Sequence, residues 1–278
     1  MLSYNTFLFK MENIIITGGT SGIGLSLVKS LASRNCKIFI LGRSKKKWNN
    51  LKVNNKIKKI VQFIEVDYQS KNFKEKILKK FSKISKIDYI FNNAGFVSSK
   101  KEMNKSSISK SLNVNTFIPI LLISILKKKI HKSKIRTIVN TTSFLSTFGN
   151  LNFNKIIKSY GYFGYMDQKF TLNLLNYYLY KNIYKKLNYI MWNPGYIKSD
   201  FGKLNNNIIG KILFKLRSKI GKNPNISVSD LIYFLDANKS KKSFSYFNVV
   251  KKTKFPIQDA DLIKFASEIN KLKSYLFL

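Results

Sequence analysis

The sequence is poor in the residues that build disulfides, metal sites and acidic surfaces. Its 278 residues include one cysteine, one histidine, four prolines, and 13 Asp and Glu against 51 Lys and Arg. The single cysteine, Cys36, excludes an internal disulfide framework and fits a reducing compartment, so we expect a cytoplasmic protein. The single histidine, His131, lies in a basic segment, so we expect it at the surface and expect neither a histidine general base nor a bound metal.

Long apolar runs and linkers are also missing. The longest apolar run, 117–126, is too short to span a bilayer. There is no Pro- or Ser-rich linker and no internal repeat, so we expect one domain over residues 11–278. Residues 1–10 lack a basic n-region and a cleavage site, which makes them a poor signal peptide. We interpret them as an N-terminal extension, with Met11 as an alternative start.

The net charge of +38 is the largest departure from ordinary composition. One interpretation is binding to nucleic acid or to an anionic membrane. The other is compositional drift, because only four of the basic residues are arginine and because Lys, Asn and Ile share A/T-rich codons. The lysines are scattered, whereas phosphate recognition would favour arginine. We therefore favour drift, expect no nucleic-acid partner, and keep peripheral membrane contact as an alternative.

A glycine-rich turn, Thr17-Gly18-Gly19-Thr20-Ser21-Gly22-Ile23-Gly24, joins the apolar run 14–16 to an amphipathic segment, 25–33. Glycines let the backbone approach a ligand closely, and the helix start beyond them offers N–H groups and a positive dipole end to a phosphate. An ordinary polar turn is the alternative. Strand, turn and helix nevertheless follow in the order that nucleotide binding requires. The glycine spacing differs from that of a Walker loop.

The remaining pattern predicts an α/β fold with about seven strands. We expect strands at 13–17, 37–41, 59–66, 87–91, 136–143, 187–192 and 245–249. We expect helices at 23–33, 70–81, 104–130 with a kink at Pro119, 165–182, 205–220, 230–236 and 259–275. The segment 144–164 is polar and aromatic, without a clear period.

Tyr165 and Lys169 open an expected helix at positions i and i+4, so they share one helix face. A lysine ammonium beside a phenol lowers the phenol's pKa from about 10, because it favours the phenolate. Such a phenol can give or take a proton near neutral pH. Tyr177 and Lys181 have the same spacing, so the pair alone is a weak signal.

Taken together, the motifs resemble the short-chain dehydrogenase/reductase family, a Rossmann-fold group that uses NAD or NADP. The resemblance covers 13–249 and rests on T-G-x-x-x-G-I-G, Asn92-Asn93-Ala94-Gly95, Asn115, Ser143, Tyr165/Lys169 and Pro194-Gly195. It implies a single Rossmann-type, doubly wound parallel sheet with helices on both faces. Tyr165 lies 29 residues before Pro194, close to the family spacing, and we interpret Tyr177 as packing.

The resemblance also implies catalytic roles. Tyr165 exchanges a proton with the substrate oxygen and Ser143 orients that oxygen. Lys169 binds the nicotinamide ribose and tunes Tyr165, and Asn115 holds a proton-relay water. The stretch 115–143 and the helix after Tyr165 resemble the retinol-dehydrogenase-like and protochlorophyllide-reductase-like branch. That branch also has a long step from the catalytic serine to the tyrosine, as here, where Tyr165 follows Ser143 by 22 positions.

Two departures from the family pattern concern the same region. Gln168 replaces the serine that usually precedes the lysine, and we expect little effect. The long separation between Ser143 and Tyr165 leaves Thr142 and Ser146 as alternative partners of the tyrosine.

The expected cofactor site lies at the carboxyl ends of the strands. No acid occurs at 41–43, and Arg43 there favours the 2′-phosphate of NADP(H). NAD(H) is the alternative cofactor. Arg43 could also be an ordinary solvated side chain. Asp67 contacts the adenine amino group or caps the helix 70–81. The residues implied to bind the cofactor are Gly18, Thr20, Ser21, Gly22, Ile23, Gly24, Arg43, Asp67, Asn93, Ala94, Gly95, Tyr165, Lys169, Pro194, Gly195, Ile197 and Ser199.

We therefore expect an NADP(H)-dependent oxidoreductase that interconverts a carbonyl and an alcohol. The alternatives are a non-catalytic NADP-binding sensor, against which the Tyr165/Lys169 pair argues, and a basic nucleic-acid-binding protein. A hydrophobic small-molecule substrate would suit the aromatic residues Phe144, Phe148, Phe153, Tyr160, Tyr162 and Phe163, unless they pack the loop. The family commonly forms homodimers or homotetramers through the long helices near Asn115 and Tyr165. The apolar ends, 7–9 and 275–278, offer contacts to a membrane or a partner.

Overall fold

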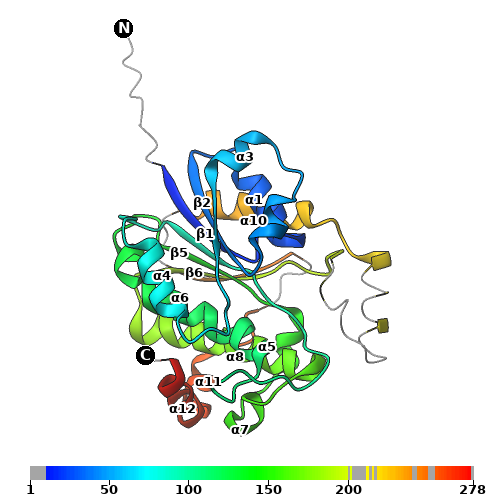
Figure 1. Ribbon diagram of the computed structural model, residues 1–278. Helices are drawn as coiled ribbons and strands as arrows, with labels where there is room; N and C mark the ends of the chain where they lie inside the picture. Colours follow the sequence, from blue (N-terminus) through cyan, green and yellow to red (C-terminus); the bar gives the residue numbers. More distant parts are fainter. Residues whose placement is uncertain are drawn as a thin grey trace.

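One seven-stranded parallel sheet forms the centre of the molecule (Figure 1). The computed structural model describes residues 11–199, 201, 211–212, 215, 218–239, 243–249 and 254–276. The strands are β1 (Glu12–Thr17), β2 (Cys36–Gly42), β3 (Val61–Glu65), β4 (Tyr89–Asn92), β5 (Thr137–Thr141), β6 (Asn188–Asn193) and β7 (Phe244–Asn248). Their order is β3-β2-β1-β4-β5-β6-β7, which confirms the predicted doubly wound sheet. In such sheets ligands bind where the strand order reverses, here between β1 and β4.

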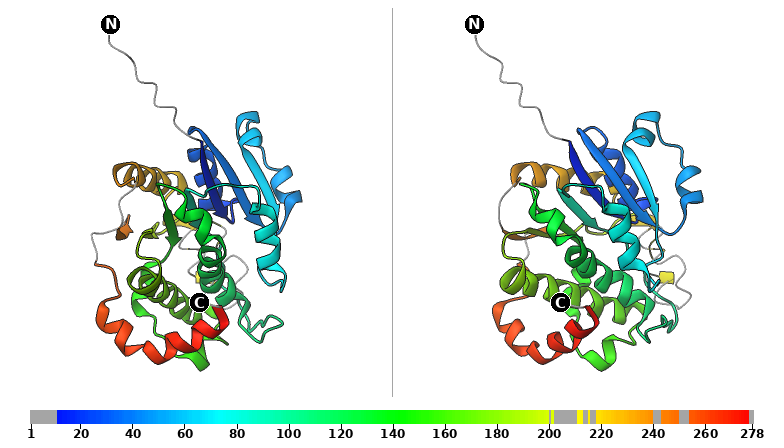
Figure 2. Two further views of the ribbon diagram at one scale, coloured as in Figure 1. Left: turned by 90° about the vertical axis from the view of Figure 1, so that its left-hand side faces the viewer. Right: turned by 60° about the vertical axis from the view of Figure 1, so that its left-hand side comes forward.

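Helices cover both faces of the sheet (Figure 2). One face carries α1 (Gly22–Leu31), α2 (Lys45–Asn49), α3 (Asn55–Ile60) and α10 (Pro224–Ala237). The other carries α4 (Phe73–Phe81), α6 (Ile118–His131) and α8 (Gly161–Tyr178), with α11 (Asp259–Lys264) and α12 (Ala266–Leu276) packed outside α8. The strands are buried on both faces: Ile14 and Ile16 enter one core and Ile15 the other.

The expected helix 104–130 is composite. It begins later, at α5 (Lys110–Leu112), and passes through a π-helical turn, η1 (Asn113–Phe117), into α6. The expected start is wrong because the side chain of Asn104 accepts hydrogen bonds from the N–H groups of Ser106 and Ile108, which closes a turn instead. Pro119 lies in the first turn of α6, where its missing N–H is tolerated, so the irregularity precedes the proline.

Other boundaries move by a few residues. The helix α3 extends to Ile60, so β3 starts two residues late, and α10 begins at Pro224 rather than at 230. The segment 144–164 contains a 3-10 turn, η2 (Phe144–Phe148), and a short helix, α7 (Phe153–Ile156). The helix α8 begins four residues before Tyr165 and ends in a second π-helical turn, η3 (Leu179–Ile183). The expected helix 205–220 lies largely outside the described residues, as do residues 1–10.

The structure also bears on membrane-spanning helices and on metal sites. Within them, no helix combines the length and the apolar character needed to cross a membrane. Within the same ranges, no three His, Cys, Asp or Glu side chains gather as a metal site would require.

Candidate active site

The glycine loop and the turn after β4 are joined by Thr17, at the end of β1. The Thr17 hydroxyl accepts hydrogen bonds from the N–H groups of Asn93 (3.0 Å) and Ala94 (2.9 Å). The Asn93 side chain donates back to the Thr17 carbonyl at 3.1 Å. Thr17 was not among the predicted site residues. Its signal in the sequence is a hydroxyl that ends a buried strand directly before the glycines, and its structural role is to hold the two turns together.

The backbone of the glycine loop requires its glycines. Gly18 and Gly22 have φ values of +72° and +51°, a region that side chains rarely tolerate. A Cβ on Gly18 would come within 3.1 Å of the Cα of Ala94, and one on Gly24 would collide with the Gly18 carbonyl. Ser21 precedes α1 without capping it through its side chain. The loop and the first turn of α1 therefore suit a pyrophosphate.

The opposite end of the predicted cofactor site lies after β2. Arg43 is exposed there, and the Tyr68 hydroxyl fixes the strand end by donating to the Leu41 carbonyl at 2.8 Å. Glu65, at the end of β3, accepts a hydrogen bond from the Lys45 N–H at 3.0 Å. An acid does therefore stand close to this edge. Glu65 lies at the end of the neighbouring strand, β3, so residues 41–43 alone do not reveal it.

Asp67 closes a local turn. Its carboxylate accepts a hydrogen bond from the Gln69 N–H at 2.9 Å. The helix α4 begins at Phe73 and is preceded by Asn72, so the alternative that Asp67 caps this helix is wrong.

Tyr165 and Lys169 lie side by side under the carboxyl end of β5. Both are buried, with 8% and 4% of their surfaces exposed. The Lys169 Nζ lies 5.7 Å from the centroid of the Tyr165 ring and donates to the Thr141 carbonyl at 2.7 Å. Burial lowers the pKa of Lys169 to about 7.

Ser143 is the half-buried hydroxyl at the end of β5. It accepts a hydrogen bond from the Leu145 N–H at 3.2 Å. Thr142 and Ser146 are fully buried, and both are bound to Asn173, at 2.8 Å and 3.0 Å. Of the three candidate hydroxyls, Ser143 is thus the one that lies towards the open side of the site.

Asn115 and Gln168 form a buried polar bridge beside the Tyr165/Lys169 pair. The Asn115 side chain accepts from the Phe96 N–H (3.0 Å) and donates to the Phe96 carbonyl (2.9 Å) and to the Gln168 carbonyl oxygen Oε1 (2.6 Å). Gln168 in turn donates to the hydroxyls of Ser111 and Ser159, both at 2.9 Å. Gln168 therefore has a structural role, which the sequence analysis did not predict when it expected this replacement of serine to have little effect.

The loop after β6 closes the far side of the site. Gly195 has a φ of +80°, and Ser227 donates to the Pro194 carbonyl at 2.8 Å. A Cβ built on Gly22 would lie 3.5 Å from the Cβ of Ser199, so this loop reaches the glycine turn. Ile197 is buried behind it. The predicted cofactor residues thus come from α8 and from the ends of five strands, β1, β2, β3, β4 and β6, that meet at one edge of the sheet.

The second tyrosine–lysine pair ties two elements together. The Tyr177 hydroxyl donates to Asp259 at 2.8 Å, and the Lys181 Nζ lies 3.0 Å from the same carboxylate. This contact joins α8 to α11 and agrees with the packing interpretation.

The aromatic residues of 144–163 divide into two groups. Tyr162 is buried and Phe153 packs against Tyr275, with ring centroids 5.5 Å apart. The exposed group consists of Phe144, Phe148, Tyr160 and Phe163.

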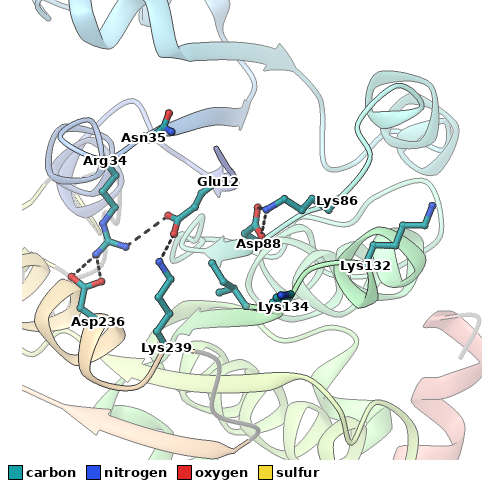
Figure 3. A pocket seen from close by; sticks show the side chains of 10 residues that line it. Glu12, Arg34, Asn35, Lys86, Asp88, Lys132, Lys134, Asp236 and Lys239 are labelled. Atoms are coloured by element: carbon teal, nitrogen blue, oxygen red, sulfur yellow. Dashed lines mark hydrogen bonds and ion pairs between the residues drawn. The ribbon is translucent and has the colours of Figure 1, made fainter. Parts of the chain in front are cut away.

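A cavity of about 650 Å³ lies at the opposite, amino-terminal edge of the sheet (Figure 3). Its acids are matched by cations: Arg34 binds Asp236 at 2.7 Å, Lys239 binds Glu12 at 2.7 Å, and Lys86 binds Asp88 at 2.6 Å. The first two pairs tie the start of β1 and the segment after α1 to the end of α10, and the third lies directly before β4, so we interpret the cavity as a structural ion-pair network.

Comparison with known proteins identifies the family. The sequence profile described as short chain dehydrogenase matches residues 12–207. The chain belongs to the short-chain dehydrogenase family. It is therefore an oxidoreductase acting on CH–OH or C=O groups. Human polyprenol dehydrogenase is 26% identical over 228 residues, which are 72% of this chain and 67% of that enzyme. Bovine very-long-chain 3-oxoacyl-CoA reductase is 34% identical over 86 residues, 30% and 27% of the two chains.

Solved structures share the fold of this dehydrogenase. An alcohol dehydrogenase from the archaeon Thermococcus sibiricus, complexed with 5-hydroxy-NADP, has a TM-score of 0.64 at 18% identity, covering 88% of this chain and all (100%) of its own. A short-chain dehydrogenase/reductase from Burkholderia phymatum, in complex with NAD, has a TM-score of 0.67 at 14% identity and covers 96% of both chains.

Proposed function

We propose that this oxidoreductase uses NADP(H) to interconvert a carbonyl and an alcohol on a hydrophobic small molecule, with Tyr165 as the acid/base. The observation that supports the proposal is the position of the Tyr165/Lys169 pair and Ser143 at the carboxyl end of β5, on the same edge of the sheet as the glycine loop after β1. When bound there, the nicotinamide supplies or accepts the hydride. The polyprenol and the very-long-chain 3-oxoacyl-CoA named in two relatives each carry a long apolar chain, which supports a hydrophobic substrate.

The chain's own residues supply the proton chemistry. Ser143 donates a hydrogen bond to the substrate oxygen and orients it towards Tyr165. In the reducing direction the Tyr165 hydroxyl gives its proton to that oxygen, and in the oxidising direction the phenolate takes the proton from the alcohol. The ammonium form of Lys169 favours the phenolate. A hydroxyl or anionic group of a ligand beside Nζ would favour this charged form.

The fit of a dinucleotide rests on the glycine loop, where Gly24 lets the first turn of α1 pack against the Gly18 carbonyl, with which a Cβ would collide. Arg43, exposed at the end of β2, supports a preference for the 2′-phosphate of NADP(H). Glu65 is held by the Lys45 N–H, so its carboxylate is directed to the backbone. NAD(H) remains the alternative cofactor. The involvement of residues from 12 to 276 in one sheet and its covering helices supports the proposal of a single domain. A cytoplasmic location stays a prediction.

The experiment is a substrate screen with paired tyrosine variants. Purified protein is assayed with NADPH and a panel of apolar aldehydes and ketones. Tyr165→Phe should lower turnover by about 10²-fold or more while NADPH still binds, because only the proton donor is lost. Tyr177→Phe, on the same helix, is the matched control and should retain activity. Turnover in Tyr165→Phe at the wild-type level would overturn the assignment.

Cofactor choice is tested in the same assay. Arg43→Ala should weaken NADPH binding by about tenfold and leave NADH binding unchanged, because only NADPH carries the 2′-phosphate. Lys46→Ala, an exposed neighbour on α2, is the control. Equal losses for the two cofactors would contradict the role of Arg43 and leave the oxidoreductase assignment intact.

A further inference from the structure

Four exposed aromatic side chains lie on the two segments that flank the catalytic residues. Phe148 and Phe163 are 65% and 74% exposed, and Phe144 and Tyr160 are about half exposed. Phe144 directly follows Ser143, and Phe163 is two residues before Tyr165. Large aromatic groups are costly to leave in water, and a group of them usually marks an interaction surface.

Contacts between the two segments bring these residues to one face. The rings of Phe144 and Phe148 pack edge to face, with centroids 5.5 Å apart. Phe163 and Asp167 share one side of α8, at positions i and i+4. The Asp167 carboxylate accepts a hydrogen bond from the Asn150 N–H at 2.9 Å, two residues after Phe148. The end of η2 and the first turn of α8 therefore form one aromatic rim beside the active site.

Lysines surround this rim. Lys155 and Lys158 precede Tyr160, and Lys100 and Lys101 are brought beside them by the hydrogen bond from the Gly161 N–H to the Ser98 carbonyl (2.9 Å). All four lysines are exposed, and the ion pairs found among the described residues do not include them. Segment 103–166 contains neither Asp nor Glu. The face is therefore both aromatic and strongly basic.

We propose that this face, defined by Phe144, Phe148, Tyr160, Phe163 and the four lysines, docks the enzyme on an anionic lipid bilayer. Aromatic side chains partition into the interface between lipid headgroups and acyl chains, and lysines bind the negative surface. In the docked protein, the site beside Tyr165 would face the bilayer. If the proposed oxidoreductase function holds, on which this last step rests, a lipid-soluble alcohol or carbonyl reaches the site from the membrane.

Charge argues against a second copy of the chain as the occupant. A two-fold symmetric dimer would place the same patch of each copy against the other. Lysines would then face lysines, and two of the three carboxylates nearest to the face, Glu102 and Glu268, already pair with Lys110 and Lys271. An anionic surface complements the same face without repulsion.

The first test is co-sedimentation of the full chain with vesicles of phosphatidylcholine alone and with added phosphatidylserine. We expect binding to the anionic vesicles only. Lys155→Gln/Lys158→Gln should weaken it by about fivefold for each lysine, and Phe148→Ser/Phe163→Ser by about tenfold or more, because the inserted rings are lost. The matched controls are Lys79→Gln/Lys80→Gln at the end of α4 and Tyr233→Ser, 79% exposed on α10. Both should bind as the wild type does.

Insertion is tested by fluorescence. Phe163→Trp should show a blue-shifted emission with anionic vesicles and quenching by brominated lipids, whereas Tyr233→Trp should show neither. The native Trp48 and Trp192 are buried and give a constant background.

Three outcomes would overturn the proposal. They are absence of binding to anionic vesicles, equal binding by the aromatic and control variants, and a solution dimer that Phe148→Ser/Phe163→Ser dissociates. The vesicle assay contains neither cofactor nor substrate, and Tyr165→Phe should bind vesicles normally. Failure of docking can thus be distinguished from failure of the proposed activity.

Discussion

At the residue scale, Lys169 combines burial with a group that is ordinarily charged. Its side-chain nitrogen donates a hydrogen bond to a neutral carbonyl, that of Thr141, and burial lowers its pKa from 10.5 to about 7. Between these values the unfolded chain binds one more proton than the folded chain, so the free energy of unfolding rises with pH. Below about pH 7 the folded protein bears the full cost of the buried charge.

The corresponding prediction uses Lys169→Met, which keeps the length of the side chain and removes the amine. The free energy of unfolding of the wild type minus that of the variant should rise between pH 7 and pH 10, with about 5 kcal/mol as the upper bound. Urea unfolding at constant ionic strength measures it. Lys181→Met, in the turn η3 that continues α8, is the control and should give a flat difference over this range, since Asp259 and Tyr177 raise the pKa of Lys181. Parallel curves for the wild type and Lys169→Met would contradict the prediction.

The side-chain amide of Asn115 is fully engaged in hydrogen bonds within the protein. Both hydrogens of its side-chain amide are used, one by Phe96 and one by Gln168. A relay water held by Asn115 would therefore compete with Phe96 and Gln168 for these two hydrogens.

At the element scale, Gln168 joins α8 to the helical stretch α5–η1. It binds Asn115 on one side and the hydroxyls of Ser111 and Ser159 on the other, at distances of 2.6 to 2.9 Å. Asn115 in turn holds both backbone groups of Phe96, directly after the turn that contacts the glycine loop. A change at Gln168 should therefore reach the cofactor site.

We expect Gln168→Leu to lower the free energy of unfolding by about 1–3 kcal/mol, because buried partners lose their hydrogen bonds. It should also weaken NADPH binding at temperatures where the protein is fully folded, because the turn 93–96 loses its support. Isothermal titration measures the second effect. Gln62→Leu, exposed on β3, is the control. A loss of stability with unchanged NADPH affinity would show that Gln168 acts on the fold alone.

Features encoded by neighbouring residues could be predicted from the sequence, whereas contacts between distant residues could not. The strands, the glycine loop and the Tyr165/Lys169 pair are encoded within a few neighbouring residues, and the strand order agrees with the predicted doubly wound sheet. The bridge from Gln168 to Asn115 spans 53 residues and that from Thr17 to Asn93 spans 76, so no local pattern reveals them. The π-helical turn at 113–117 looks like ordinary helix in the sequence, because its residues have no distinctive spacing.

At the scale of the whole molecule, α11 and α12 form an additional layer over α8 (Figures 1 and 2). Phe170 packs against Phe265, with ring centroids 5.5 Å apart, and Glu268 accepts a hydrogen bond from the Phe153 N–H. This layer covers part of the outer face of α8, on which a dimer through the long helices would depend. Any assembly of the chain must therefore use a surface that this layer leaves open.

The last prediction concerns this layer. Leu272, fully buried on α12, belongs to the core that also contains α6 and α8. Leu272→Ala should lower the free energy of unfolding by about 2–5 kcal/mol, through lost apolar contact and the cavity that remains. Loosening α12 uncovers apolar surface on α8, so sedimentation velocity should show new association. Leu78→Ala, half exposed on α4, should change neither quantity. A destabilised Leu272→Ala that stays unassociated would mean that α8 remains covered, and that the C-terminal layer does not control assembly.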